Sequence, residues 1–148
     1  MIRITFLLLL IFTISCKSSK NQFINSGNIG LSKFYVLKID NNKKYPIFEN
    51  TKPSGLSFSE IMELEKLIKP KIEETSAEHQ YDRQYYAALN EHGEKLVYIF
   101  LFCDESVSDF YNLTKERTNI SDGGNCYFKL KINFSNKQII SYSVHGYG

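Results

Sequence analysis

Three cysteines and three histidines supply the residue types in this chain that most often carry nucleophilic, redox or metal chemistry. Cys103 ends one segment of alternating apolar residues, and Cys126 begins a later one. By alternation both side chains face inward, so neighbouring antiparallel strands would bring the two sulfurs opposite each other. The pattern favours a disulfide between Cys103 and Cys126, with two buried thiols as the alternative.

A third interpretation makes Cys126 the nucleophile of a cysteine-dependent hydrolase, with His145 or His79 as its base. Cys126 precedes a strand-like segment, so it lacks the helix dipole that activates many reactive thiols. His79, His92 and His145 have neither the i,i+4 spacing nor the paired cysteines of metal sites. The Asp-Gly-Gly-Asn turn at 122–125 offers too few oxygen ligands for calcium. We therefore predict no catalytic residue, metal or cofactor.

The first fifteen residues have the features of a secretory signal peptide. Arg3 is the single charge, residues 4–12 are largely apolar, and the small polar residues Thr13 and Ser15 follow. This apolar run is too short to cross a hydrocarbon core of about 30 Å as a helix, which takes roughly 20 residues. The segment therefore predicts export rather than a membrane span.

The sequence Thr-Ile-Ser-Cys at residues 13–16 resembles the lipobox of bacterial lipoproteins. That resemblance implies that Cys16 is acylated and becomes the first residue of the mature protein. Several acyl chains on one cysteine exceed the two-chain requirement for stable membrane anchoring. The Cys-Lys-Ser-Ser-Lys start and the composition rich in Asn, Lys, Ile and Tyr also resemble small lipoproteins of the Bacteroidota. This implies an outer-membrane protein of the cell envelope, on the periplasmic or the surface face.

Length and charge indicate one folded domain after a tether. Residues 16–32 are polar and rich in Ser, Asn and Gly, and we interpret them as a flexible tether that leaves residues 33–148 for a single domain. The net charge is +2, with basic and acidic residues interspersed. Because no basic stripe is present, we expect no nucleic-acid partner. A membrane, through the lipid, and an envelope protein are the partners expected.

A helix is predicted to begin at Ser57, because Ser57 and Glu60 have the spacing of a capping box. Apolar residues at spacings of three and four follow as far as Ile72, which predicts one buried stripe. Pro70 predicts either a stop near Lys69 or a kinked helix that continues through residue 74.

Three hairpins are predicted from apolar alternation and turn residues. Their paired segments are 34–40 with 45–48, 81–89 with 95–103, and 126–134 with 138–144. The segment 95–103 is apolar on both faces, which predicts cover on two sides or an interface. In the last hairpin Phe128 is expected to face inward and Tyr127 and Lys129 outward. The polar residues 104–119 are predicted to contain one short helical turn near 109–115.

The order of these elements predicts an α+β fold, with one helix packed on an antiparallel β-meander and a short hairpin before it. This arrangement resembles cystatin-like folds. Residues 79–145 are also similar to uncharacterised small envelope proteins of the Bacteroidota, a resemblance that implies no activity. We expect a lipid-anchored binding or interaction module rather than an enzyme; the alternatives are the Cys126 hydrolase and a cystatin-like protease inhibitor.

Overall fold

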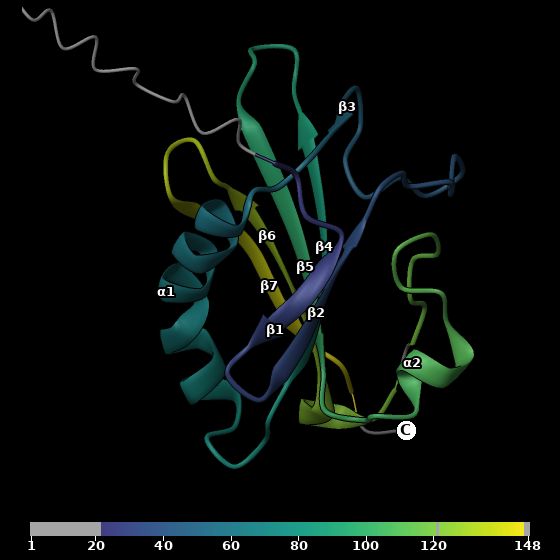
Figure 1. Cartoon of the computed structure of the whole chain (residues 1–148), viewed down its shortest axis with the longest axis vertical. Coiled ribbons are helices and arrows are strands. Elements are labelled where there is room, and N and C mark those ends of the chain that lie inside the picture. Colours follow the sequence, from purple (N-terminus) through teal and green to yellow (C-terminus); the bar gives the residue numbers. More distant parts are fainter. Residues whose placement is uncertain (1–21, 121, 147–148) are drawn as a thin grey trace, which may run out of the picture.

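The computed structural model describes residues 22–120 and 122–146. One long helix packs on a seven-stranded, mostly antiparallel sheet (Figure 1). In the sheet order β1-β2-β4-β5-β6-β7, β3 also pairs with β4. The elements are β1 (Ser26–Ile29), β2 (Ser32–Leu37), β3 (Lys52–Ser54), α1 (Phe58–Thr75), β4 (Asp82–Leu89), β5 (Lys95–Phe102), α2 (Val107–Phe110), the 3-10 turn η1 (Gly124–Cys126), β6 (Tyr127–Asn133) and β7 (Gln138–Val144).

The strands β4 to β7 form a continuous antiparallel meander, which confirms the two predicted hairpins of the second half of the chain. The turn between β4 and β5 contains Gly93 at φ 76°, a conformation that glycine adopts at little cost. Alternation places Val97, Ile99 and Leu101 of β5 on the face that α1 covers. Tyr98 and Phe100 occupy the opposite face, which we call the outer face.

The predicted first hairpin was wrong in its second strand. β2 pairs with β1, which lies inside the predicted tether 16–32, and residues 45–48 form no strand. The physical reason lies partly in Asp40, whose carboxylate accepts hydrogen bonds from the backbone of Asn42 and Ile47 and curls the chain into a loop. Beyond the meander the sheet gains β1 and β2, with β2 parallel to β4.

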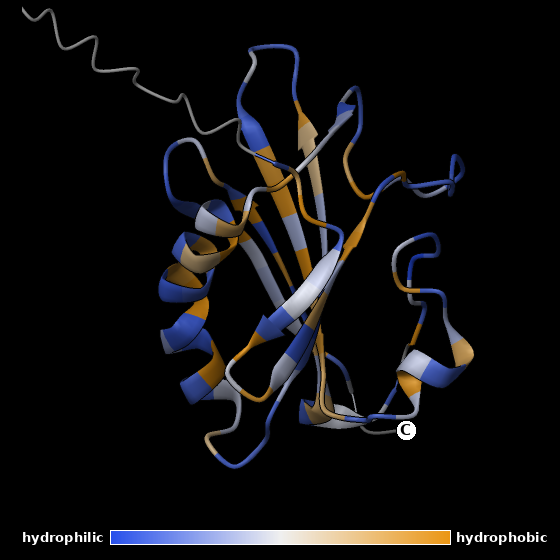
Figure 2. Ribbon diagram, in the orientation of Figure 1, coloured by the Kyte–Doolittle hydropathy of each residue, from blue (hydrophilic) through white to orange (hydrophobic). Residues whose placement is uncertain are grey.

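The helix α1 begins where the capping box predicts. The backbone of Ser57 donates to the Glu60 carboxylate, and the Glu60 backbone donates to the Ser57 hydroxyl at 3.3 Å. Leu56 and Ile61 flank the cap as a buried hydrophobic staple. α1 continues through Pro70 to Thr75, so the helix does not stop near Lys69. Figure 2 shows the apolar stripe of α1 turned toward the sheet.

A buried ion pair also joins α1 to the sheet. Arg83 on β4 makes a two-point contact with the Glu65 carboxylate, Nε to Oε1 at 3.0 Å and Nη2 to Oε2 at 2.9 Å. The buried hydroxyl of Tyr85 donates to the same carboxylate. Since side-chain exposure is only 9% for Arg83 and 11% for Glu65, both charges depend on each other for solvation.

In the part of the chain that the structure describes, no helix is long and apolar enough to cross a membrane.

The outer face of the sheet is covered by residues 104–125, which we call the β5–β6 connection, and by the loop between β2 and β3 (Figure 1). Val107 and Leu113 of the connection and Ile47 of the loop are buried against β5. Of the two predicted alternatives for 95–103, cover on two sides or an interface, the structure shows cover on two sides. It corrects the outward position of Tyr127, which is only 8% exposed because the connection lies over it. The short helix α2 begins two residues before the predicted turn at 109–115 and overlaps its first two residues.

Candidate functional site

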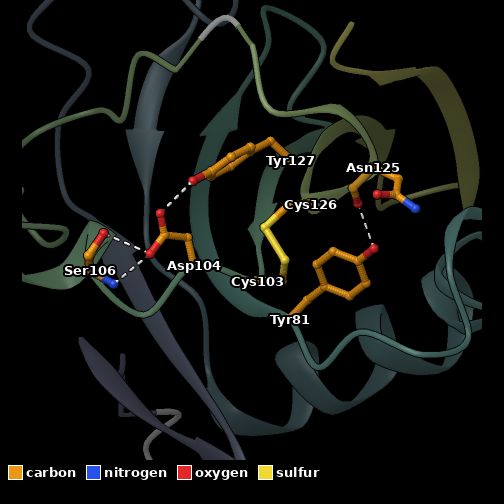
Figure 3. Close-up of a disulfide and its surroundings, with 7 residues drawn as sticks. All are labelled: Tyr81, Cys103, Asp104, Ser106, Asn125, Cys126 and Tyr127. Atoms are coloured by element: carbon orange, nitrogen blue, oxygen red, sulfur yellow. Dashed lines mark hydrogen bonds between the residues drawn. A yellow bond between two sulfur atoms is a disulfide. The ribbon is translucent and has the colours of Figure 1, made fainter. Parts of the chain in front are cut away.

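Cys103 and Cys126 form a disulfide, as the alternation of their strands predicted (Figure 3). Cys103 directly follows β5 and Cys126 directly precedes β6, so the antiparallel register sets the two residues opposite each other. The Cys103 amide donates to the Cys126 carbonyl at 3.0 Å, which extends the β5–β6 ladder by one bond. Because both sulfurs are bonded, Cys126 has no thiol to serve as a nucleophile. The hydrolase interpretation therefore has no support.

Hydrogen bonds around the disulfide secure both ends of the β5–β6 connection (Figure 3). At its start, Asp104 accepts from the Ser106 amide and hydroxyl and from the Tyr127 hydroxyl. These bonds, the one from the Ser106 hydroxyl first, lower the pKa of Asp104. At its end, the Tyr81 hydroxyl donates to the Asn125 carbonyl at 2.6 Å. The connection thus leaves and re-enters the sheet at fixed points.

The buried side-chain amide of Gln84 on β4 makes four hydrogen bonds to the middle of the connection. Its Nε2 donates to the carbonyls of Leu113 and Glu116 at 2.8 and 2.6 Å. Its Oε1 accepts from the Thr118 amide and hydroxyl at 3.2 and 3.1 Å. Both donors and both acceptor positions of the Gln84 amide therefore bond to this segment. The segment contains no strand that pairs with the sheet.

Between the connection and the β2–β3 loop, the outer face contains an open cavity of about 320 Å³, which we call the cationic pocket. Tyr98, Phe100, Lys129 and Lys131 of β5 and β6 form its floor. Residues 45–47 and 117–120 form its two walls, and His145 lies after β7 at one end. Among the described residues that line the pocket, three carry a fixed positive charge and none is acidic.

Arg117 ties the two walls of the cationic pocket together. Its Nη1 donates to the Tyr45 carbonyl at 2.9 Å and to Oδ2 of Asp40 at 3.3 Å. The Asp40 side chain is only 5% exposed and also caps the loop, so it offsets one positive charge beside the pocket. Lys129 and Lys131 also line the pocket, and they are not part of this ion pair.

Lys131 shows the electrostatic cost of this arrangement. Burial, followed by the charges of Arg117 and Lys129, lowers its pKa, while Glu49 and Asp40 act in the opposite direction. Its Nζ donates to the Ile47 carbonyl at 2.5 Å, a neutral partner. Three like charges thus lie close together, and the neighbouring carboxylates of Asp40 and Glu49 offset only part of their repulsion.

Aromatic groups and a histidine line the floor and the end of the cationic pocket. Burial raises the pKa of Tyr98 to about 12, so its hydroxyl stays protonated at neutral pH. The His145 ring lies against Phe100 and Tyr127, with centroids 5.8 and 6.1 Å apart. Burial, and then the charge of Lys129, lowers the pKa of His145 in spite of the nearby Asp122. Its Nδ1 is buried without a hydrogen-bond partner, a situation that a bound water or ligand relieves.

The other predicted site residues lie apart from this pocket. Cys16 lies outside the described residues. His79 packs edge-on against Tyr81 beside the disulfide, and the exposed His92 lies in the β4–β5 turn. Residues 122–125 form a turn and η1, with Gly123 in the left-handed region at φ 100°. Throughout residues 22–120 and 122–146, no group of three or more His, Cys, Asp or Glu is arranged to hold a metal ion.

Sequence reasoning missed the cationic pocket. The alternation of β6 did place Lys129 and Lys131 on one face, and the two apolar faces of β5 did indicate that this face is covered. No pattern along the chain indicated that Arg117 would join these lysines. Comparison of the chain with protein-family models, with curated proteins and with solved structures finds no match to any of them.

Proposed function

We propose that this chain is a lipid-anchored protein of the cell envelope, of the kind found in Bacteroidota, and that its domain is a binding module. The observation that carries the envelope assignment is the Cys103–Cys126 disulfide. Such bonds persist in oxidising compartments and are rare in a reducing cytosol. The signal-like residues 1–15 and the lipobox-like end at Cys16 support the same assignment.

The binding role rests on the cationic pocket. It combines a concave shape, an aromatic floor and charges with few partners of opposite sign. Sites for small ligands have this composition, with apolar walls and a few polar groups that fix orientation. The disulfide and Gln84 hold one wall in place before any ligand arrives, which reduces the entropy lost on binding.

Lipid attachment is tested by expressing the full chain in a bacterium that is fed a palmitate analogue with a click-reactive tag. We expect label on the wild-type chain and its recovery in the membrane fraction. A Cys16→Ser variant should be unlabelled, whereas the double variant Cys103→Ser/Cys126→Ser should keep its label. A wild-type chain without label, or one recovered from the soluble fraction, would contradict the anchor.

A second candidate function is inhibition of an envelope protease. The observation that favours it is α1 followed by the β4–β7 meander, the element order of cystatin-like folds. Incubation of the full chain with a papain-type protease should then yield a stable complex on size-exclusion chromatography and a loss of peptidase activity. Unchanged proteolysis at an excess of the chain would remove this candidate.

A further inference from the structure

We infer that the cationic pocket binds a small soluble oxyanion, a carboxylate or phosphate ester with a ring or short apolar body. This inference rests on the proposed function only in treating the domain as a binding module. It adds the site, its residues and the chemical class of the ligand.

The positive charge of the pocket supports an anionic ligand. Lys129, Lys131 and Arg117 converge on one cavity, and Asp40 is the carboxylate in direct contact with one of them. Lys131 shares the pocket with two other cations, and burial together with their charges lowers its pKa. An oxyanion between these groups would accept charge-assisted hydrogen bonds and relieve their mutual repulsion.

The shape of the pocket supports a small ligand with an aromatic or short apolar part. About 320 Å³ lies at the lower end of the range for small-molecule sites, too little for the acyl chains of a lipid. Phe100 and Tyr98 form the floor, and Ile120 and Pro46 stand on opposite walls. A flat ring could thus lie over the aromatic floor while its anionic group faces Lys129 and Lys131.

Lys129 is the residue on which the test should act. Its side chain is exposed and makes none of the hydrogen bonds that join the walls, unlike Arg117 and Lys131. A change at Lys129 therefore alters the charge of the pocket without removing a structural contact. Lys66 on α1 is a matched control, because it is exposed and lies on the opposite side of the sheet.

The experiment measures binding of phenyl phosphate and of benzoate to the full chain in a non-ionic detergent by isothermal titration calorimetry. Benzyl alcohol is the neutral comparison, and glycerol 3-phosphate represents a lipid headgroup without a ring. We expect at least one ring-bearing anion to bind with a dissociation constant below about 1 mM and benzyl alcohol not to bind. Lys129→Gln should weaken that binding about tenfold, and Lys129→Glu should abolish it.

Three results would overturn the inference: no anion binds the wild-type chain, benzyl alcohol binds as well as the anions, or Lys66→Gln weakens binding as much as Lys129→Gln. Tighter binding of glycerol 3-phosphate than of both ring-bearing anions would overturn the inference that the ligand carries a ring. That result would indicate a lipid headgroup as the ligand. Thermal unfolding of each unliganded variant checks that the fold is unchanged. Lipid labelling at Cys16 is measured separately, so a failure of the anchor and a failure of the pocket are distinguishable.

Discussion

Gln84 is the residue whose replacement should disturb the outer face most selectively. Gln84→Leu keeps most of the side-chain volume but removes four hydrogen bonds to the β5–β6 connection. The carbonyls of Leu113 and Glu116 and the amide of Thr118 then lose their partners. We expect residues 113–118 to lift away from the sheet so that water can hydrate these groups.

The size of the effect follows from the number of bonds. A hydrogen bond contributes about 1 kcal/mol net, and the leucine recovers part of the loss through apolar burial. The free energy of unfolding should therefore fall by about 3 kcal/mol. For a domain of this size that free energy corresponds to a fall in Tm of about 10 °C. The anion affinity of the cationic pocket should fall as well, because Arg117 lies in the same segment.

Differential scanning calorimetry gives the change in Tm, and hydrogen exchange at the Thr118 amide reports on the segment itself. Gln84→Glu is a second variant, because its carboxylate can still accept from Thr118 but cannot donate to the two carbonyls. Gln138→Leu, at an exposed position of the edge strand β7, is the matched control. If Gln84→Leu lowered Tm no more than Gln138→Leu, or left exchange at Thr118 unchanged, the role assigned to Gln84 would be refuted.

Three further predictions concern the stability of the domain. Cys103→Ser/Cys126→Ser should lower the free energy of unfolding by about 3 kcal/mol, measured by denaturant titration, and reductant should bring the wild-type chain close to the variant and leave the variant unchanged. Arg83→Met should cost about 3–5 kcal/mol because it leaves the Glu65 carboxylate buried and unpaired, whereas Arg83→Met/Glu65→Leu should recover most of that loss in the same titration. The lowered pKa of His145 means that the unfolded chain binds its proton more readily, so stability should fall as pH drops below about 6.5; His145→Gln should show a smaller fall between pH 7.5 and 5, and an equal fall would contradict the assignment.

The helix and the meander were predictable because their signals are local. The Ser57 and Glu60 cap and the apolar stripe of α1 lie within a few turns of one helix. Short turns join β4 to β5 and β6 to β7, so alternation and turn residues together indicate the pairing within each of these two hairpins. The disulfide followed from the same information, because the phase of alternation and the order of neighbouring strands set Cys103 opposite Cys126.

The prediction failed at β2, where the pairing partner had to be chosen between two flanking segments. Residues 45–48 look apolar enough for a strand, but Ile47 is used to cover the outer face and Pro46 lines the pocket. β1 forms a strand although it has few apolar residues, because pairing with β2 gives hydrogen-bond partners to its backbone N–H and C=O groups. Composition alone favours residues 45–48 over β1 as the partner of β2, whereas β1 is the strand that pairs with it.

By itself the sequence determined a helix with its start and the strands of a meander, and it favoured a disulfide and the burial of both faces of β5. The export signal and Cys16 are also sequence features, and they stay predictions. Only the tertiary structure decided what covers the outer face and where the positive charges meet. The Arg117 to Asp40 contact joins residues 77 positions apart. Periodicity reports which face a side chain occupies but not which distant loop packs on it, since that choice depends on the combined packing of the whole chain.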